Sequence, residues 1–386
     1  MADTLPLAGI TVVELGDNAA APFCGQVLGD LGADVIKIER PGVGDPSRHF
    51  AKPDWNGLSP MFAAINRNKR SVVVDIKDPA DLARLHALIS DQADVFFHNL
   101  RPGTSAKFGL DSESLLKLNP RLVYLELGAF GNRGPLAKAP GYDPLMQAFG
   151  GIMSVTGEQG RPPVRVGVPI IDFGAGLWSV IGITSALNRR HTTGKGGVVD
   201  VSLYETALAW MSFLSAANMA TGEMPARLGS GTVITAPYRA YECADGYLVV
   251  AAANDRLYAK LAQALGHPEW STDAKLNGNI ARVQNRDHCD QLIGDIMITA
   301  PRAVWREKLD AAGVPNAPLQ DIAEVHAHPQ TAALGMLLAT SNPALKLMGV
   351  PVSFDGARPQ VRREPAPLGA HTEEVLGKFG EKPGPA

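Results

Sequence analysis

The first 130 residues alternate between strand-like and helix-like segments, and this alternation constrains the fold more than any other feature of the chain. Residues 10–15 and 34–38 are apolar runs rich in Val and Ile, which is typical of buried strands. The helix predicted between them has Pro22 in its first turn, where a missing N–H is harmless, and stops at Gly32. A strand, a helix and a strand in this order predict a βαβ unit, which builds a parallel sheet.

The same pattern continues into the middle of the chain. Two apolar segments rich in small residues, 174–190 and 204–221, are predicted as long buried helices on either side of a short strand at 198–203. The sequence therefore predicts an α/β fold with a large domain, in which helices flank a parallel sheet. The other elements of this domain are predicted strands at 71–74, 94–97 and 122–126 and a predicted helix at 79–92.

A second pattern begins near residue 222. Strand-like segments at 238–242 and 247–252 are joined through Ala244-Asp245-Gly246, which predicts a hairpin, and amphipathic helices follow it. This pattern indicates a smaller α+β domain. We expect a large domain over 1–200, a linker helix over 201–224, the small domain over 225–325, and a return to the large domain over 326–386, with frayed residues at 381–386.

Composition limits the classes of partner. The 386 residues are 45% hydrophobic and 19% charged with a net charge of -3, so the chain is globular and is not expected to bind nucleic acid. Three scattered cysteines predict neither a disulfide framework nor a zinc site, which fits the cytoplasm. The pair His326 and His328 lacks a third ligand, so no metal site is expected. Neither a signal peptide nor a membrane span is expected, because the charge-free stretches are short.

Polar side chains follow several predicted strands directly. Ligands of open parallel sheets bind outside the carboxyl ends of the strands, and an Arg there can donate two hydrogen bonds to a phosphate. The first turn lacks the GxGxxG pattern, so no nicotinamide or flavin cofactor is expected. Each polar residue by itself is equally consistent with a solvated loop, but together they indicate an anionic, nucleotide-like ligand. Arg40, Asn99 and Arg101 follow predicted strands, and Leu100 belongs to the same segment as the last two. Asn66 and Lys69 come just before the strand predicted at 71–74.

One carboxylate is a candidate nucleophile. Asp172 lies between an apolar run and a glycine-rich helix start that contains Gly174 and Gly176. An Asp at this place can be only a helix cap, but glycines beside it would let a bulky group approach the carboxylate. Asp143, in the glycine-flanked turn with Tyr142, either caps the helix that follows it or supplies a second carboxylate.

Five segments of the sequence, taken together, match the pattern of a known protein family. They are 31–40 (LGADVIKIER), 68–71 (NKRS), 141–143 (GYD), 167–176 with Asp172, and 193–196 (TGKG). In this order they resemble the class III CoA-transferase family, which includes the formyl-CoA and carnitine CoA-transferases. The resemblance covers nearly the whole chain. It implies a Rossmann-like domain made from both chain ends, a small domain, and two subunits interlocked as a homodimer.

The resemblance also implies an enzyme mechanism. Asp172 would attack the thioester of an acyl-CoA and form a mixed anhydride, which the released CoA thiolate would convert to an aspartyl-CoA thioester. A small carboxylic acid would then form a second anhydride and receive CoA. Acyl-CoA, CoA and carboxylates are therefore the expected substrates, and no tightly bound cofactor is expected.

The family's site residues transfer by position. Formyl-CoA members have Gln, Arg and Glu where this chain has Ala19, Lys107 and Asp143. A glycine-rich substrate loop of those members matches Gly229-Ser230-Gly231, so the acceptor pocket transfers least well. The residues expected around CoA are Asn18, Ala19, Ala20, Arg40, Asn66, Lys69, Asn99, Leu100, Arg101, Lys107, Tyr142 and Asp143.

Two other functions compete with CoA transfer. α-Methylacyl-CoA racemases share the fold and the aspartate but add a histidine as second acid/base, where this chain has Tyr142. A tyrosine with an ordinary pKa of about 10 is a poor base, so an acyl-CoA racemase or epimerase is the less favoured alternative. A non-catalytic acyl-CoA-binding protein is the third. For the transferase we favour a dicarboxylyl group such as succinyl, whose free carboxylate would need Arg165, Arg227 or Arg239.

Overall fold

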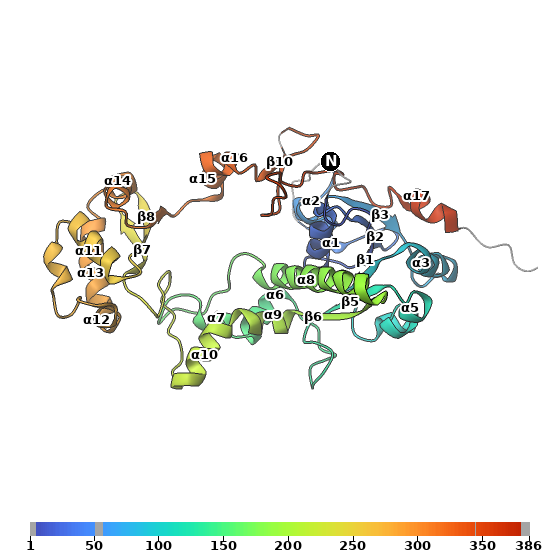
Figure 1. The fold of residues 1–386 in the computed structure, drawn as a ribbon, viewed down its shortest axis with the longest axis horizontal. Helices are drawn as coiled ribbons and strands as arrows, with labels where there is room; N and C mark the ends of the chain where they lie inside the picture. Colours follow the sequence, from blue (N-terminus) through green and yellow to red (C-terminus); the bar gives the residue numbers. More distant parts are fainter. Residues whose placement is uncertain (1–4, 51–56, 344, 380–386) are drawn as a thin grey trace, which may run out of the picture. The chain divides into compact units, whose positions relative to one another are not determined.

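The computed structural model describes residues 5–50, 57–343 and 345–379, which form two compact units (Figure 1). The first unit comprises Met1–Gly151, Val166–Ser212 and Pro329–Ala386, and the second comprises Ile152–Arg165 and Phe213–His328. The domain boundaries expected from the sequence stay a prediction; the structure adds that 152–165 packs with the second unit. The expected fraying of 381–386 concerns residues outside the described part.

A six-stranded parallel sheet forms the centre of the first unit, in the order β3-β2-β1-β4-β5-β6. The strand order reverses between β1 and β4, where Leu15 pairs with His98, and such a reversal opens a crevice at the carboxyl edge. The predicted α/β fold with a parallel sheet is confirmed. The strands are β1 Thr11–Leu15, β2 Asp34–Glu39, β3 Lys69–Val73, β4 Val95–His98, β5 Val123–Gly128 and β6 Gly197–Ser202.

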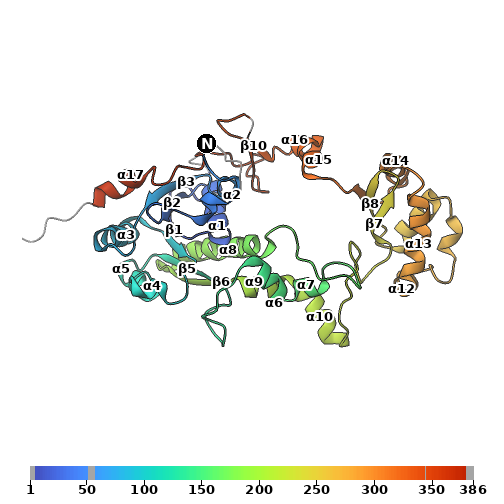
Figure 2. The ribbon, with the colours of Figure 1, turned by 180° about the vertical axis from the view of Figure 1, so that it is seen from behind.

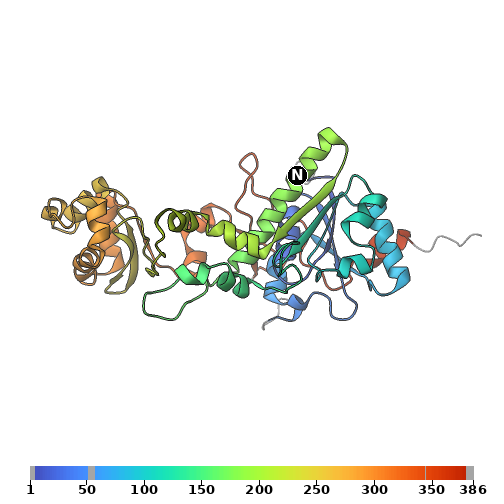
Figure 3. The ribbon, with the colours of Figure 1, turned by 90° about the horizontal axis from the view of Figure 1, so that it is seen from below.

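Helices cover both faces of this sheet. On one face lie α1 (Ala20–Asp30) and the long α8 (Ile170–Thr193), which runs beside β6 (Figures 2 and 3). On the other face α3 (Pro79–Gln92), α5 (Ser112–Leu118) and α17 (Thr372–Leu376) enclose an apolar core. Val13, Ile36, Phe96, Leu85 and Leu376 belong to this core and are buried.

Two expectations about buried helices are wrong. The α8 side chains Leu177, Trp178 and Ile181 are 44%, 41% and 52% exposed, so one side of this helix is open. The second helix, predicted at 204–221, is broken at Met211 into α9 (Leu203–Trp210) and α10 (Ser212–Thr221), and no residue of α10 is buried. An apolar composition without periodicity does not tell which side of a helix is covered, so it overstates burial.

By length and composition, α8 is the one described helix that could cross a membrane. Half of its most apolar stretch is buried against the rest of the chain, and the core helix of a globular domain passes the same test. This single helix is therefore only weak evidence for a membrane span.

The second unit has its own sheet and core. The predicted hairpin is confirmed as β7 (Tyr238–Cys243) and β8 (Gly246–Ala251), and β9 (Asn316–Pro318) pairs antiparallel with β8. The helices α11 (Asp255–Ala264), α13 (Arg286–Met297) and α14 (Arg302–Ala312) bury one apolar face each against this sheet.

The remaining helices and strands of the two units are shorter connecting elements. They are η2 Pro46–His49, α2 Pro60–Ile65, α4 Thr104–Lys107, α6 Asp143–Phe149, α7 Ile152–Val155, η3 Pro268–Ser271, α12 Asn279–Gln284, α15 Ile322–Ala327, α16 Pro329–Ala333, β10 Leu337–Ala339, β11 Lys346–Met348 and η4 Gly377–Phe379.

Candidate active site

A cavity of about 1130 Å³ opens at the carboxyl edge of the six-stranded sheet. Every strand of the sheet contributes wall residues at or just after its carboxyl end, so the cavity follows the crevice that the strand order predicts. Predicted site residues from the first turn, from β2, from β4 and from α8 meet here. Those that line the cavity are Asn18, Ala19, Ala20, Arg40, Asn99, Leu100, Arg101, Tyr142 and Asp172.

Four of the residues expected around CoA are not on this wall. Lys69 is buried under α1, where its ammonium lies 2.9 Å from Glu14 Oε2 and donates to Asn66 Oδ1 at 2.8 Å. Burial lowers the pKa of Lys69 to about 8, while the charge of Glu14 opposes this shift. Lys107 is exposed at the end of α4, and Asp143 is buried beside α8. Their roles as CoA contacts stay predictions.

The predicted substrate loop belongs to the second unit. The N–H of Gly229 donates to the carbonyl of Gly157, and Ser230 Oγ accepts from the N–H of Ala240 at 3.0 Å. These contacts fix the loop within its own unit. The predicted role of Gly229, Ser230 and Gly231 in substrate binding therefore stays a prediction.

The cavity wall carries more cations than the sequence analysis singled out. Arg40 lies 3.0 Å from Asp17 Oδ2 and its side chain is 58% exposed, while Glu39 is occupied by Arg48 at 2.7 Å. Lys77 was missed, although it follows β3 as Arg40 follows β2, and the same rule would have found it. The other two missed cations, Arg133 and Lys138, lie in the long connection from β5 to α6, whose path no local signal predicts.

Acidic side chains line the far end of the sheet edge. Glu126 on β5 is the direct neighbour of Asp200 on β6, and both belong to the cavity wall. Burial, and then the charge of Asp200, raise the pKa of Glu126. An anionic group is therefore disfavoured beside Glu126 and Asp200.

Asp172 lies in the first turn of α8, where the sequence also allowed it to be the helix cap. The capping carboxylate is instead that of Asp143. Asp143 Oδ2 accepts hydrogen bonds from the backbone N–H groups of Ile171 at 2.8 Å and Asp172 at 3.2 Å. Gln147 Nε2 donates to Asp143 Oδ1 at 2.6 Å and holds it in place. Asp143 thus caps α8 rather than the helix that it begins. The side chain of Asp172 is left to face the cavity.

The environment of Asp172 shifts its acid–base equilibrium. Burial raises its pKa, the charge of Asp143 raises it further, and the result is about 7. We find no hydrogen bond to the Asp172 carboxylate from the residues that the structure describes. The Asp143 carboxylate already occupies the N–H groups at the start of α8, which would otherwise favour the charged form. The carboxylate is consequently poorly solvated near neutral pH, which makes it a stronger nucleophile.

The two glycines near Asp172 have a different role from the one expected. A Cβ on Gly174 would lie 2.8 Å from Thr206 Cγ2 on α9, and a Cβ on Gly176 would lie 2.9 Å from the carbonyl oxygen of Ala20 on α1. These glycines let α9 and α1 pack closely on α8. The interpretation that they leave room for a thioester is therefore wrong, because the chain itself fills that space.

Comparison with known proteins shows which family this chain resembles over nearly its whole length. The model of CoA-transferase family III matches residues 7–372. An acetyl-CoA:oxalate CoA-transferase of Acetobacter aceti is 38% identical over 94% of this chain and 92% of its own. A succinyl-CoA:glutarate CoA-transferase of Mus musculus is 34% identical over 96% of this chain and 86% of its own. A solved CAIB/BAIF family protein from Brucella suis is 36% identical with a TM-score of 0.88, over 97% of this chain and 99% of its own.

Proposed function

Because this chain belongs to CoA-transferase family III and is a CoA-transferase, we propose that Asp172 is its nucleophile. The observation that carries the proposal is the position of this carboxylate. It lies at the wall of the cavity on the carboxyl edge of the sheet, with its pKa raised to about 7 and its backbone fixed by Asp143. The resemblance identified in the sequence is confirmed by the family match.

The proposed reaction moves CoA between two carboxylic acids in balanced steps. An Asp172 oxygen attacks the thioester carbon, the carbon–sulfur bond breaks, and a mixed anhydride and CoA thiolate result. The thiolate attacks the Asp172 carbonyl carbon, releases the first acid, and leaves an aspartyl-CoA thioester. The acceptor carboxylate then attacks the aspartyl thioester carbon, the carbon–sulfur bond breaks, and a second anhydride and CoA thiolate result. The thiolate attacks the acyl carbon of the acceptor, which forms the new acyl-CoA and releases the Asp172 carboxylate. No net proton is transferred, so the reaction needs a nucleophile and does not need a general base.

We propose that CoA lies along the sheet edge with its phosphates toward the cations of the wall. Lys77 and Arg40 follow the adjacent strands β3 and β2, and Arg101 follows β4 on the other side of β1, so positive charge lies on both sides of the turn after β1. The Arg40 side chain is engaged only with a partly exposed Asp17, and such surface ion pairs exchange at little cost. The turn at 16–20 lets its backbone approach the ligand closely, since Ala19 and Ala20 carry small side chains.

We propose dicarboxylates as the substrate class. The relatives named above act on oxalate and on succinyl-CoA with glutarate, and a succinate–glutarate CoA-transferase of Agrobacterium fabrum is 34% identical to this chain. A dicarboxylyl-CoA keeps one free carboxylate in the site, which needs a cation. Arg133 and Lys138 on the cavity wall are now candidates beside those suggested by the sequence.

The test is the capture of the aspartyl thioester. Hydroxylamine converts such a thioester to a hydroxamate, which peptide mass spectrometry locates. We expect a hydroxamate on the peptide with Asp172 after incubation with succinyl-CoA, and none in Asp172→Asn. The matched control is Asp200→Asn, which removes another carboxylate of the same wall and should leave the labelling unchanged. A hydroxamate in wild type on a residue other than Asp172 would refute the proposal.

The racemase alternative finds no support at its key position. Tyr142 is 61% exposed on the cavity wall, and it stands where the racemases have the histidine that acts as their second acid/base. Racemisation would require solvent deuterium at the α-carbon of an acyl-CoA in the absence of an acceptor acid. We expect no such exchange.

We also propose that the protein acts as a homodimer in the cytoplasm. The exposed stripe of Leu177, Trp178 and Ile181 on α8 supports a dimer, because an apolar stripe of this kind marks an interface. Light scattering after size-exclusion chromatography should give twice the chain mass. Trp178→Glu should lower that mass, because it places a charge in the stripe.

A further inference from the structure

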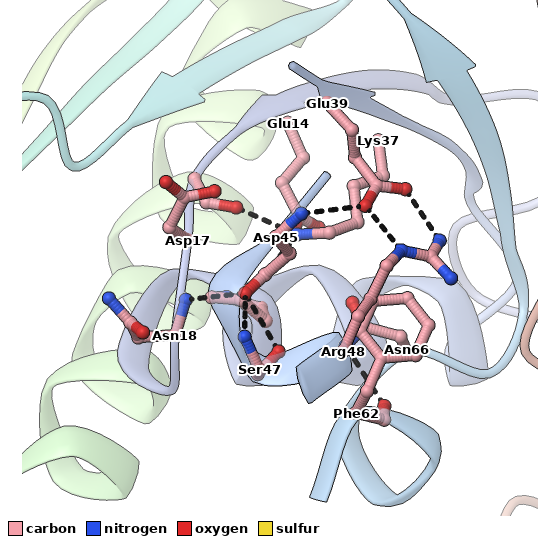
Figure 4. Close-up of polar contacts among 12 residues, drawn as sticks. Glu14, Asp17, Asn18, Lys37, Glu39, Asp45, Ser47, Arg48, Phe62 and Asn66 are labelled. Atoms are coloured by element: carbon pink, nitrogen blue, oxygen red, sulfur yellow. Dashed lines mark hydrogen bonds and ion pairs between the residues drawn. The ribbon is translucent and has the colours of Figure 1, made fainter. Parts of the chain in front are cut away.

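The turn that joins β1 to α1, residues 16–18, lines the cavity where the strand order reverses. Asn18 has a left-handed backbone with φ +67°, which residues with a side chain adopt only when their surroundings hold them there. Figure 4 shows that polar side chains from neighbouring segments converge on this turn. Each of its three residues is held by a different side chain.

Lys37 holds the first residue of the turn. This lysine lies on β2 beside Glu14 of β1, and it is 1% exposed. Its ammonium donates to the carbonyl oxygen of Gly16 at 2.7 Å and lies 2.9 Å from both Glu14 Oε1 and Asp45 Oδ2. The contacts with Gly16 and Glu14 are hydrogen bonds, and the contact with Asp45 is an ion pair. Burial lowers the pKa of Lys37, but the charges of Glu14 and Asp45 outweigh this and keep it above its usual value.

Asp45 holds the third residue. Its Oδ1 accepts from the backbone N–H of Asn18 at 3.1 Å and from the N–H and hydroxyl of Ser47 at 2.9 Å and 2.7 Å (Figure 4). The Asp45 side chain is completely buried, and its second oxygen faces Lys37. The short helix η2 that follows is fixed to β2 through Arg48 and Glu39. The carboxylate can therefore move only if a buried ion pair breaks, which is costly.

Asn99 holds the middle residue from the other side of the crevice. Its Oδ1 accepts from the N–H of Asp17 at 3.1 Å, and its Nδ2 donates to the carbonyl oxygen of Asp17 at 2.9 Å. These two bonds join the segments that follow β1 and β4, beyond the last paired residues Leu15 and His98. The Asn99 side-chain amide thus bonds the Asp17 backbone as a neighbouring strand would, at the point where β1 and β4 separate.

We propose that Lys37, Asp45 and Asn99 are positioning residues that hold the 16–18 turn in its CoA-binding conformation before CoA arrives. The inference rests on the proposed function, because it requires CoA to occupy this cavity. Lys37 and Asp45 do not line the cavity, so they act on the ligand only through the turn. A turn that is already ordered binds without the cost of ordering it, which strengthens the affinity.

The first test uses the unmodified protein. Hydrogen exchange should show the amides of Asp17 and Asn18 already protected without ligand, because each donates to a side chain. Addition of CoA should leave the exchange of these two amides unchanged. Protection that develops only after CoA is added would overturn the inference. This measurement shows whether the 16–18 turn is ordered before CoA binds, and it does not depend on the folding of any variant.

The second test compares two buried aspartates: Asp45, which contacts the turn before α1, and Asp30, the last residue of α1. Asp45→Asn removes the charge opposite Lys37, while Asp30→Asn removes the charge opposite Arg67, which lies 2.6 Å away in an equally buried pair. We expect Asp45→Asn to raise the Kd for CoA on the order of tenfold, by titration calorimetry. Asp30→Asn should lower the Tm and leave the Kd unchanged. A purely structural role would give both variants the same Kd as wild type.

The two proposals fail in distinguishable ways. If wild type binds CoA and Asp45→Asn binds it equally well, only the positioning inference is overturned. If wild type binds CoA with a preordered turn but yields no hydroxamate on Asp172, the proposed nucleophile is wrong and the positioning inference stands. If wild type does not bind CoA, both are refuted.

Discussion

At the scale of single residues, the proposal that Asp172 is the nucleophile predicts how the rate depends on pH. Only the carboxylate is a nucleophile, and burial beside Asp143 raises the pKa of Asp172 to about 7. We therefore expect kcat/KM to rise with pH across a midpoint near 7 and then level off. The measurement is a pH–rate profile with succinyl-CoA. A midpoint near 4, the ordinary value for Asp, would contradict the buried environment described here.

The second residue-scale prediction concerns Asp143. Asp143→Asn keeps an oxygen for the N–H groups of Ile171 and Asp172 but removes the neighbouring charge. The remaining cause of the shift is burial, so the pKa of Asp172 should fall below 7 without reaching its ordinary value. The midpoint of the pH–rate profile should move toward acid. An unchanged midpoint would mean that the charge of Asp143 is not felt by Asp172.

The same pKa shift has a consequence for stability. A carboxyl with a raised pKa in the folded state binds its proton more tightly there than in the unfolded chain, where the value is about 3.9. As pH rises from 4 to 7, the free energy of unfolding should therefore fall, and above 7 the loss is complete. Asp172→Asn cannot ionise, so its Tm minus that of wild type should grow between pH 4 and pH 8. A constant difference in thermal melts would count against the shift.

At the scale of elements, α1 packs closely on α8, the helix that carries Asp172. Gly176→Ala would push a Cβ against the carbonyl of Ala20 and Phe23 Cδ1, and backbone cannot yield as a side chain can. We expect a loss of about 1–3 kcal/mol in the free energy of unfolding and a higher KM for acyl-CoA, because the displaced Ala20 lines the cavity.

The matched control for this prediction is Gly294→Ala. Gly294 lies within α13 and has no heavy atom within 4 Å of an added Cβ. Helix propensity alone should then stabilise the protein by up to about 1 kcal/mol. Urea denaturation of both variants separates the two effects. Stabilisation by Gly176→Ala would show that α1 and α8 are not in close contact.

At the scale of the whole molecule, the first unit is built from both ends of the chain. Asn68 Oδ1 accepts from the backbone N–H groups of Arg362 and Arg363, and Leu376 on α17 is completely buried in the core beside α3. Leu376→Ala should therefore lower the free energy of unfolding by about 2–5 kcal/mol. Leu118→Ala, at a site that is 51% exposed, should change it by less than about 0.5 kcal/mol. Equal effects in urea denaturation would mean that α17 is not part of the core.

Local patterns in the sequence were sufficient to predict the strands of the large sheet and the helix α3. The helix predicted at 79–92 is observed as α3, because Asp78 caps it, Pro79 begins it and its apolar residues recur at helical spacing. The strands are predicted within a few residues because buried parallel strands are continuous apolar runs. The position of Arg40 and Asn99 at the cavity also followed from the sequence, because carboxyl ends of parallel strands share one edge.

What only the tertiary structure decided are the contacts between residues far apart in the chain. By itself the sequence determined the alternation of strands and helices, the family, and Asp172 as the candidate nucleophile. It did not reveal that Lys69 turns inward to Glu14, that Gly176 receives α1, or that Asp143 caps a helix that begins 27 residues later. The sequence around a charged residue or a glycine does not show whether that residue contacts solvent, a ligand or another part of the chain. The neighbour that satisfies it is chosen by packing, which depends on the whole fold.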